Sequence, residues 1–298
     1  MRACVIFNPT ARGNKARALR GQLDRIAAAC TLKPTTGPGA ATSLAAEAVK
    51  EEFDTVIAAG GDGTVNEVVN GLAQAETGLG RTRLGILPLG TINVFARELG
   101  LPARLDRAWD IIRRGRELRV DLPMVEYASG GCTLRRAFAQ LGGAGLDSRA
   151  IACVDWQWKT RIGPLAYVLG GLKAMRGRQP QVTVTLADGR RASGELVLLG
   201  NGRYYGGWIP MFPGTSLCDG RVAVRVFPRV TLLTLARFGL AWLFRTGFTT
   251  RHEIRWHTTA LTLTSDPPGV PFELDGDNIG PLPARVTVRR EALRVLVP

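Results

Sequence analysis

Residues 1–121 alternate short apolar runs with longer amphipathic segments. Apolar runs rich in β-branched residues predict strands over residues 3–8, 55–59 and 84–88. Apolar positions that recur every three or four residues predict helices over residues 15–29, 41–52, 66–75, 92–99 and 108–114. Strands that alternate with helices predict an α/β domain with a mostly parallel sheet, in which ligands bind beyond the carboxyl ends of the strands.

The pattern changes after residue 121. Short β-branched segments occupy residues 182–186, 194–199, 221–227, 260–264 and 286–289, and Gly, Pro or Asp residues separate them. This pattern predicts a β-rich antiparallel sandwich or barrel over residues 122–298, whose final strand can return to the first domain. Two apolar, basic stretches, residues 156–178 and 230–251, interrupt the predicted strands.

The composition is that of a globular protein, with 45% hydrophobic and 21% charged residues. The longest apolar stretch, residues 231–244, contains Arg237 and is too short to span a bilayer. The chain starts with strand-like residues and carries 5 scattered cysteines without a CxxC pair. We therefore expect no secretory leader, disulfide framework or zinc site, and a cytoplasmic protein.

The net charge of +14 favours polyanionic partners, which include ATP, nucleic acid and the anionic face of a membrane. A charge that serves only solubility is an equally good explanation. Charge alone supports nucleic-acid binding, since the sequence contains no recognition motif for it, and we expect no nucleic-acid partner.

The segment after the predicted strand 55–59 reads Gly-Gly-Asp-Gly-Thr over residues 60–64. A strand, a glycine turn and a helix N-terminus together favour phosphate binding, because small residues let backbone N–H groups approach the anion. The turn lacks the Lys-Ser/Thr pair of a Walker A loop and the GxGxxG spacing of a dinucleotide fingerprint. Its carboxylate, Asp62, predicts a magnesium-bound polyphosphate as the ligand, although a lone Asp in such a turn more often only forms the turn.

Three further strings accompany this turn: Asn-Pro-Thr at residues 8–10, Pro-Leu-Gly-Thr-Ile-Asn-Val-Phe-Ala-Arg at 88–97 and Leu-Asp-Gly-Asp at 274–277. In this order the four strings resemble the diacylglycerol kinase-like lipid kinases, which include bacterial diacylglycerol kinases and sphingosine kinase relatives. The resemblance implies a nucleotide-binding catalytic domain of the phosphofructokinase/NAD kinase type at residues 1–121 and a lipid-binding domain at 122–298. It also implies ATP-dependent phosphorylation of a lipid hydroxyl, with diacylglycerol as the leading substrate.

The resemblance assigns nucleotide contacts to residues of the three N-terminal strings and of the loop near residue 35. These are Asn8, Pro9, Thr10, Thr35, Gly60, Gly61, Asp62, Gly63, Thr64, Val65, Asn66, Glu67, Gly90, Thr91 and Asn93. Asp62 is also expected to act in catalysis, because it would order the ATP phosphates directly or through Mg²⁺. Val94 departs from many relatives, which carry Asp at this position.

Capping explains part of this set equally well. Thr64 and Glu67 have the spacing of a capping box at a helix start, and Thr91 is placed to cap the helix predicted over residues 92–99. Asn93 is expected to lie one turn inside that helix.

Two acidic turns remain in the second half of the chain. The resemblance makes Asp275 the general base that accepts the proton of the lipid hydroxyl and Asp277 the supporting acid, although Asp-Gly is ordinarily a hairpin signal. Asp219 corresponds to a structural magnesium site in relatives, which supply a Lys where this chain has Ser216. A hairpin turn is at least as good an explanation of Asp219.

The stretch 230–246 has leucine and aromatic residues beside Arg229, Arg237 and Arg245, which recur every eight residues. Such a helix suits an anionic lipid interface, where a lipid kinase would meet its substrate, or else covers the second domain's sheet from inside. A homodimer also remains open as an assembly. The alternatives to a lipid kinase are an NAD kinase-like enzyme, which shares the glycine-aspartate turn, and a non-catalytic lipid- or nucleotide-binding regulator.

Overall fold

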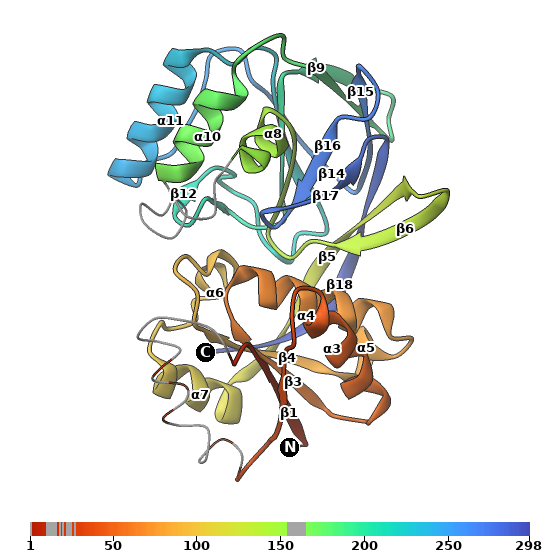
Figure 1. Cartoon of the computed structure of the whole chain (residues 1–298), viewed down its shortest axis with the longest axis vertical. Helices are drawn as coiled ribbons and strands as arrows, with labels where there is room; N and C mark the ends of the chain where they lie inside the picture. Colours follow the sequence, from red (N-terminus) through yellow and green to blue (C-terminus); the bar gives the residue numbers. More distant parts are fainter. Residues whose placement is uncertain are drawn as a thin grey trace. The chain divides into compact units, whose positions relative to one another are not determined.

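The computed structural model describes residues 2–9, 17, 19, 21, 26, 28–153 and 165–298. The chain divides into two compact units, of which the first is Met1–Leu122 with Arg290–Pro298 and the second is Pro123–Arg289. Two long strands, β5 (Arg116–Ser129) and β18 (Ala284–Val297), each contribute residues to both units (Figure 1). The last residues of the chain thus belong to the first unit.

The first unit is built on a parallel sheet in the order β2-β1-β3-β4, followed by the C-terminal part of β18. Its strands are β1 (Ala3–Phe7), β2 (Thr31–Pro34), β3 (Thr55–Gly60) and β4 (Arg83–Pro88). All residues of β1 and β3 are buried, as expected for parallel strands that are covered on both faces. The predicted α/β domain is confirmed. The sequence did not predict β2, because this edge strand is short and contains Lys33 and Pro34.

The helices of the first unit lie on the sheet. They are α3 (Ala40–Lys50), α4 (Asp62–Gln74), α5 (Gly78–Arg81), α6 (Val94–Glu98) and α7 (Leu105–Arg114). Trp109 and Ile112 of α7 share a core with Val5 and Ile57. α3 and α4 pack closely, since a Cβ at Gly71 would lie 2.3 Å from the Thr42 carbonyl oxygen. The helix predicted over residues 15–29 lies largely outside the described residues.

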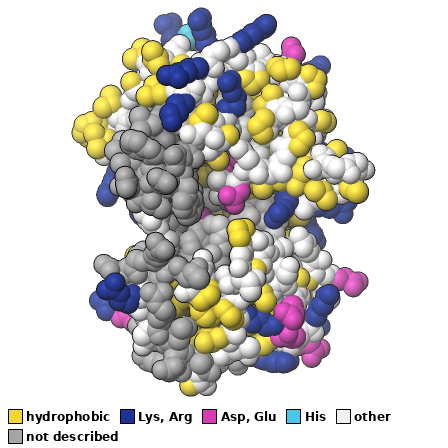
Figure 2. All heavy atoms as spheres, in the orientation of Figure 1, with side chains coloured by type: hydrophobic (Ala, Val, Ile, Leu, Met, Phe, Trp, Pro, Cys, Tyr) yellow, Lys and Arg dark blue, Asp and Glu magenta, His cyan; other side chains and the backbone are white. Residues whose placement is uncertain are grey.

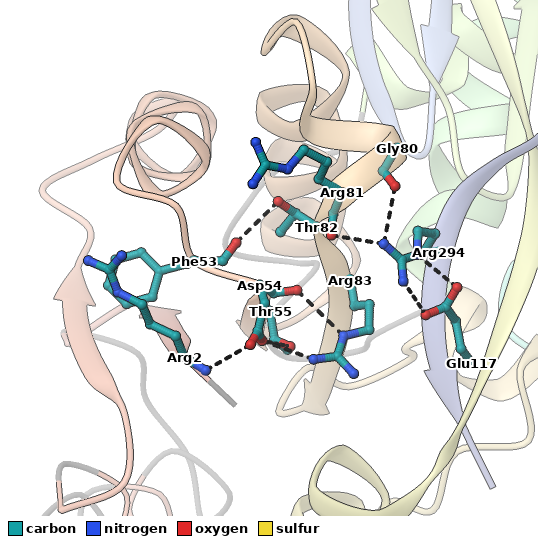
Figure 3. A network of polar contacts seen from close by, with 10 residues as sticks. All are labelled: Arg2, Phe53, Asp54, Thr55, Gly80, Arg81, Thr82, Arg83, Glu117 and Arg294. Carbon is teal, nitrogen blue, oxygen red and sulfur yellow. Dashed lines mark hydrogen bonds and ion pairs between the residues drawn. The ribbon is translucent and has the colours of Figure 1, made fainter.

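A polar network ties the last strand into the first unit (Figure 3). The Arg294 guanidinium pairs with both carboxylate oxygens of Glu117 at 2.7 Å and donates to the carbonyls of Gly80 and Arg81 at 3.1 and 2.9 Å. Hydrogen bonds from Arg294 lower the pKa of Glu117, although partial burial opposes the shift. β18 is therefore fixed to β5 and to the end of α5 by charge as well as by strand pairing.

The second unit contains two antiparallel sheets with a shared apolar core. One has the order β14-β13-β10-β7-β16-β17 and the other β18-β15-β8-β9, while β5 pairs with β18 and β6. Val197, Val224 and Phe272 of the first sheet share the core with Val184 and Leu263 of the second. The strands are β6 (Cys132–Ala137), β7 (Leu141–Gly145), β8 (Gln181–Leu186), β9 (Arg191–Gly194), β10 (Leu196–Gly200), β13 (Val222–Phe227), β14 (Ile254–Thr258), β15 (Ala260–Asp266), β16 (Pro271–Leu274) and β17 (Asp277–Pro281), with the small pair β11 (Tyr204–Tyr205) and β12 (Ile209–Pro210). The predicted antiparallel sandwich is confirmed.

Three helices cover the outer face of the six-stranded sheet. They are α8 (Leu146–Ala152), α10 (Leu165–Ala174) and α11 (Leu232–Phe244), and α10 and α11 lie side by side (Figure 1). Leu198 and Ala223 of the sheet share a core with Leu146 and Ala241 of these helices. Among the described residues, no helix is both long and apolar enough to cross a membrane.

Candidate functional site

The carboxyl ends of the first unit's parallel strands bring four sequence-predicted segments to one edge. In the register of the sheet, Phe7 lies opposite both Pro34 and Ala59, and Gly60 lies opposite Pro88. The residues that follow these strands are therefore neighbours in the order of the sheet: Thr35 after β2, Asn8 after β1, Gly61 after β3 and Leu89 after β4. Asn8 and Pro9 are exposed and Thr35 is half-buried, while Thr10 lies outside the described residues.

The Gly-Gly-Asp-Gly-Thr turn begins where β3 ends. Helix α4 starts at Asp62 with Gly61 as its N-cap, so the half-buried Asp62 carboxyl belongs to the first helical turn, where the helix dipole favours negative charge. A Cβ at Gly60 would lie 2.3 Å from Thr64 Oγ1, so the turn requires glycine there. At Gly63, by contrast, a Cβ would meet no atom within 4 Å, which leaves that side of the turn accessible to a ligand.

The second glycine turn joins β4 to α6 and is held by Asn93. Its side chain accepts the Gly90 N–H at 3.0 Å through Oδ1 and donates from Nδ2 to the Gly90 carbonyl at 2.6 Å. Asn93 is the N-cap residue of α6 and has a left-handed backbone with φ of 53°. Two expectations are therefore wrong. The exposed Thr91 does not cap this helix, and Asn93 precedes the helix instead of lying one turn inside it.

The two glycine turns contact each other. A Cβ at Gly61 would lie 3.3 Å from the Gly90 Cα, and one at Gly90 would lie 2.6 Å from the Gly61 Cα. Leu89 also donates its N–H to the Gly60 carbonyl at 2.9 Å. The structure thus brings the two predicted phosphate turns together as one continuous backbone surface at the edge of the sheet.

Glu67 does not form the capping box that its spacing suggests. Its carboxylate accepts the N–H groups of Gly39 at 2.9 Å and Ala41 at 3.0 Å, so it caps the neighbouring helix α3. The side chains of Val65 and Asn66 are buried, and Asn66 accepts hydrogen bonds from Asn70. Of the residues in this helix assigned to nucleotide binding, these three support the turn from behind.

In the second unit, Asp275 forms the turn between β16 and β17. Its carboxylate accepts three backbone N–H groups, those of Ala139 at 2.7 Å, Gln140 at 3.0 Å and Leu141 at 2.9 Å. Its backbone is left-handed, with φ of 49°, and its N–H donates to the Leu141 carbonyl at 2.8 Å. Asp277 lies on the other side of Gly276 at the start of β17 and is exposed. The structure therefore places Asp275 as the anchor of the turn and directs Asp277 toward solvent.

A buried carboxyl group supports this turn from below. Glu273, which is fully buried, accepts the Gly276 N–H at 2.8 Å. The sequence analysis did not select Glu273. Its alternation with Phe272 and Leu274 in a strand pattern would have drawn attention to an inward-facing acid two residues before Asp275.

The turn at Asp219 has the contacts of an ordinary hairpin. The Asp219 carboxylate accepts the N–H of Ser216 at 3.2 Å and of Arg221 at 2.9 Å. Across the part of the chain that the structure describes, no group of three or more His, Cys, Asp or Glu side chains is arranged to hold a metal ion. The magnesium site at Asp219 stays a prediction of the resemblance alone.

Comparisons with known proteins agree with this geometry. Residues 2–125 match the family "Diacylglycerol kinase catalytic domain", and residues 142–297 match "YegS C-terminal NAD kinase beta sandwich-like domain". A diacylglycerol kinase of Bacillus subtilis is 30% identical over 307 residues, which cover 100% of this chain and 96% of that protein. A diacylglycerol kinase of Staphylococcus carnosus is 28% identical over 305 residues, with coverage of 100% and 95%.

A solved structure shares the fold. The crystal structure of a diacylglycerol kinase from Bacillus anthracis has a TM-score of 0.78 and 24% sequence identity, and the match covers 100% of this chain and 97% of that one. The resemblance inferred from the four motifs is confirmed. The chain belongs to the diacylglycerol kinase family, with the catalytic domain of that family followed by a YegS-type β-sandwich domain.

Proposed function

We propose that this protein is an ATP-dependent lipid kinase that transfers the γ-phosphoryl group to a lipid hydroxyl, with diacylglycerol as the substrate. The observation that carries the proposal is the contact between the two glycine turns, which offers backbone N–H groups and a helix N-terminus at the end of the parallel strands. The names of the full-length relatives support the choice of diacylglycerol, because those proteins are diacylglycerol kinases over almost their entire length.

The first unit binds ATP in this proposal. Asn8, Thr35 and the two glycine turns follow neighbouring strands, so a nucleotide lying along this edge can contact all of them. The phosphates lie against the turn that contains Gly63, where a ligand has room. Asp62 suits Mg²⁺, because a carboxylate beside a polyphosphate needs a cation between them, and the metal would neutralise phosphate charge.

The second unit holds the lipid and supplies the base. The lipid hydroxyl oxygen attacks the γ-phosphorus, the bond to the bridging β–γ oxygen breaks, and the hydroxyl proton passes to a carboxylate. The sequence pointed to Asp275 as that base, but its oxygens already accept three backbone N–H groups. We therefore assign the proton to the exposed Asp277 and give Asp275 the supporting role of fixing the turn.

The lipid substrate stays in a bilayer, so the enzyme needs a membrane-facing surface. Helix α11 supplies one in this proposal, because five large apolar side chains on it are more than half exposed: Leu232, Leu233, Leu240, Leu243 and Phe244. Figure 2 shows apolar side chains together with Lys and Arg side chains over this part of the second unit. We propose peripheral binding to an anionic bilayer through this surface.

The test is a lipid kinase assay with labelled ATP, Mg²⁺ and vesicles that contain diacylglycerol. Label should enter the organic phase, and Asp62→Asn should lower turnover at least about 100-fold in a folded protein, as when an electrostatic group acting in the transition state is lost. Asp110→Asn, which changes an exposed carboxylate on α7, is the matched control and should leave turnover unchanged. Near-normal turnover in Asp62→Asn would contradict the assigned site. Label entering NAD and not lipid would support an NAD kinase, and no transfer at all would support a non-catalytic regulator.

A further inference from the structure

Two buried carboxyl groups face each other beneath the Asp275–Gly276–Asp277 turn. Asp147 comes from α8 and is 8% exposed, and Glu273 comes from β16 and is 0% exposed. Both occupy the space over Gly143, the partner of Glu273 on β7. A Cβ at Gly143 would lie 1.9 Å from Asp147 Oδ2 and 3.0 Å from Glu273 Oε1. A glycine at position 143 thus makes room for the pair.

The outer oxygen of each carboxyl group has a donor. The Tyr205 hydroxyl donates to Asp147 Oδ1, and the Gly276 N–H donates to Glu273 Oε2 at 2.8 Å. The inner oxygens, Asp147 Oδ2 and Glu273 Oε1, are buried and receive no hydrogen bond from any donor in the described structure. Two buried carboxylate oxygens that face each other without a donor repel, whereas one proton between them satisfies both.

The charges around the pair favour the protonated form. Burial is the main cause that raises the pKa of Glu273, and the charges of Asp147 and Asp275 raise it further. Burial likewise raises the pKa of Asp147, against the hydrogen bond from Tyr205. Arg149, on the same helix as Asp147, directs its guanidinium to the Gln179 side chain at 2.7 Å and not to the pair.

The pair connects α8 to the acidic turn. Through Glu273 it holds the Gly276 N–H, and two further contacts join the same elements. The Ser148 hydroxyl donates to the Pro271 carbonyl at 2.6 Å, and Asn278 donates to the Ser148 carbonyl at 3.0 Å. A change in the charge of the pair would therefore act on the turn that carries Asp277.

We propose that Asp147 and Glu273 share one proton and are positioning residues that hold the Asp275–Gly276–Asp277 turn in place for phosphoryl transfer. This inference rests on the proposed lipid kinase function, because it assigns the turn a role in that reaction. Neither residue touches the substrate in this proposal. They act through Gly276 on the carboxylate that accepts the proton.

Amide variants test the shared proton directly. In Asp147→Asn the amide oxygen can still accept from Tyr205 while the NH₂ group donates to Glu273, and in Glu273→Gln the oxygen accepts from Gly276 while the NH₂ group donates to Asp147. Each single variant therefore copies the singly protonated pair. In the double variant two NH₂ groups face each other, and a buried donor lacks an acceptor.

We expect both single variants to keep kcat within a few-fold of the wild type, and the double variant to lose roughly tenfold or more in kcat with an unchanged KM for ATP. The wild type should show the infrared carbonyl band of a buried carboxylic acid at neutral pH, and each single variant should lack it. Because the folded-state pKa is raised, the wild type should lose free energy of unfolding as pH rises above the ordinary carboxyl range of about 4, and the single variants should not.

Single variants as impaired as the double variant, or a wild type without the infrared band, would overturn the shared proton. A double variant as active as the wild type would overturn the positioning role. If the wild type phosphorylates no lipid, the proposed function fails, whereas the infrared and unfolding measurements still decide the state of the pair. The two failures can thus be told apart.

Discussion

Gly61 and Gly90 lie so close that a Cβ on Gly90 would stand 2.6 Å from the Gly61 Cα. They belong to different turns, one after β3 and one after β4, which are neighbouring parallel strands. The close approach requires glycine on both sides and aligns the N-terminus of α4 with the turn that Asn93 holds. The contact explains why two separate glycine strings in the sequence contribute to one candidate phosphate surface.

Gly90→Ala should weaken ATP binding about tenfold or more. The added methyl group would also lie 2.7 Å from Asn93 Oδ1, so both turns must shift, and overpacking of this kind costs about 1–3 kcal/mol. Calorimetric titration with ATP measures the effect. Gly80→Ala is the matched control, because a Cβ there meets no atom within 4 Å. Equal ATP affinity in the two variants would mean that the turn contact does not shape the nucleotide site.

Asp277→Asn should lower kcat at least about 100-fold, the lower end for loss of a general base, without changing the free energy of unfolding. Asp275→Asn should instead reduce the free energy of unfolding by about 1–3 kcal/mol, because an amide NH₂ group then faces backbone N–H groups that need an acceptor. Both variants should still bind ATP. An unchanged unfolding curve in Asp275→Asn, together with an active Asp277→Asn, would return the base to Asp275.

The ion pair of Glu117 and Arg294 should make the first unit sensitive to acid. The pKa of Glu117 is lowered in the folded protein, so its stabilisation is complete above the ordinary Glu pKa of about 4.3 and is lost as pH falls through the lowered value. Glu117→Gln should therefore lose about 1–3 kcal/mol at neutral pH and less in acid. Denaturant unfolding at several pH values measures this. A constant difference between wild type and variant across that range would contradict the role of the charge.

The alternation of strands and helices determined how much of the candidate site could be predicted from sequence. Apolar runs that end in glycine place the turns after β3 and β4 at one edge, because parallel strands share their direction. Local spacing was less informative. The pattern Thr-x-x-Glu fits a capping box, yet the partners of Glu67 are Gly39 and Ala41 on another helix. Spacing within one helix does not reveal acceptors that serve another helix.

Contacts between distant segments could not be predicted at all. Asp147 and Glu273 come from a helix and a strand far apart in the chain, and only the strand register places both over Gly143. The anchoring of Asp275 likewise depends on N–H groups that precede β7. The sequence identified the acidic turn, but the choice between its two carboxylates required the hydrogen bonds.

Helix α11 also combines two roles that the sequence treated as alternatives. Leu235, Phe238 and Trp242 pack on the core of the second unit, as the internal-helix alternative expects. Leu233 and Phe244 are nevertheless 69% and 68% exposed. A helix that is apolar on its outward face has no reason in the fold of its own unit to be so, which favours an external apolar partner.

Leu240→Asn with Leu243→Asn should weaken binding to phosphatidylglycerol vesicles about tenfold, because each leucine would otherwise bury apolar surface in the bilayer interface. Sedimentation with the vesicles measures binding, and lipid turnover should fall in parallel while ATP affinity stays unchanged. Leu134→Asn is the matched control, since Leu134 is an exposed leucine on β6, away from this surface.

The charged part of the same surface makes a separate prediction. Arg237→Glu with Arg245→Glu should weaken binding to phosphatidylglycerol vesicles further, because each basic group near an anionic surface contributes about 1 kcal/mol. Binding of the wild type should fall with added salt and be weak on neutral phosphatidylcholine vesicles. Both arginines also have contacts within the unit, Arg237 with the Thr249 carbonyl and Arg245 over the Trp208 ring, so the unfolding curve of the variant must be compared with that of the wild type. If the leucine and arginine variants bind vesicles as the wild type does, α11 is not the membrane-facing surface, and its exposed leucines must meet a protein partner or a second copy of the chain.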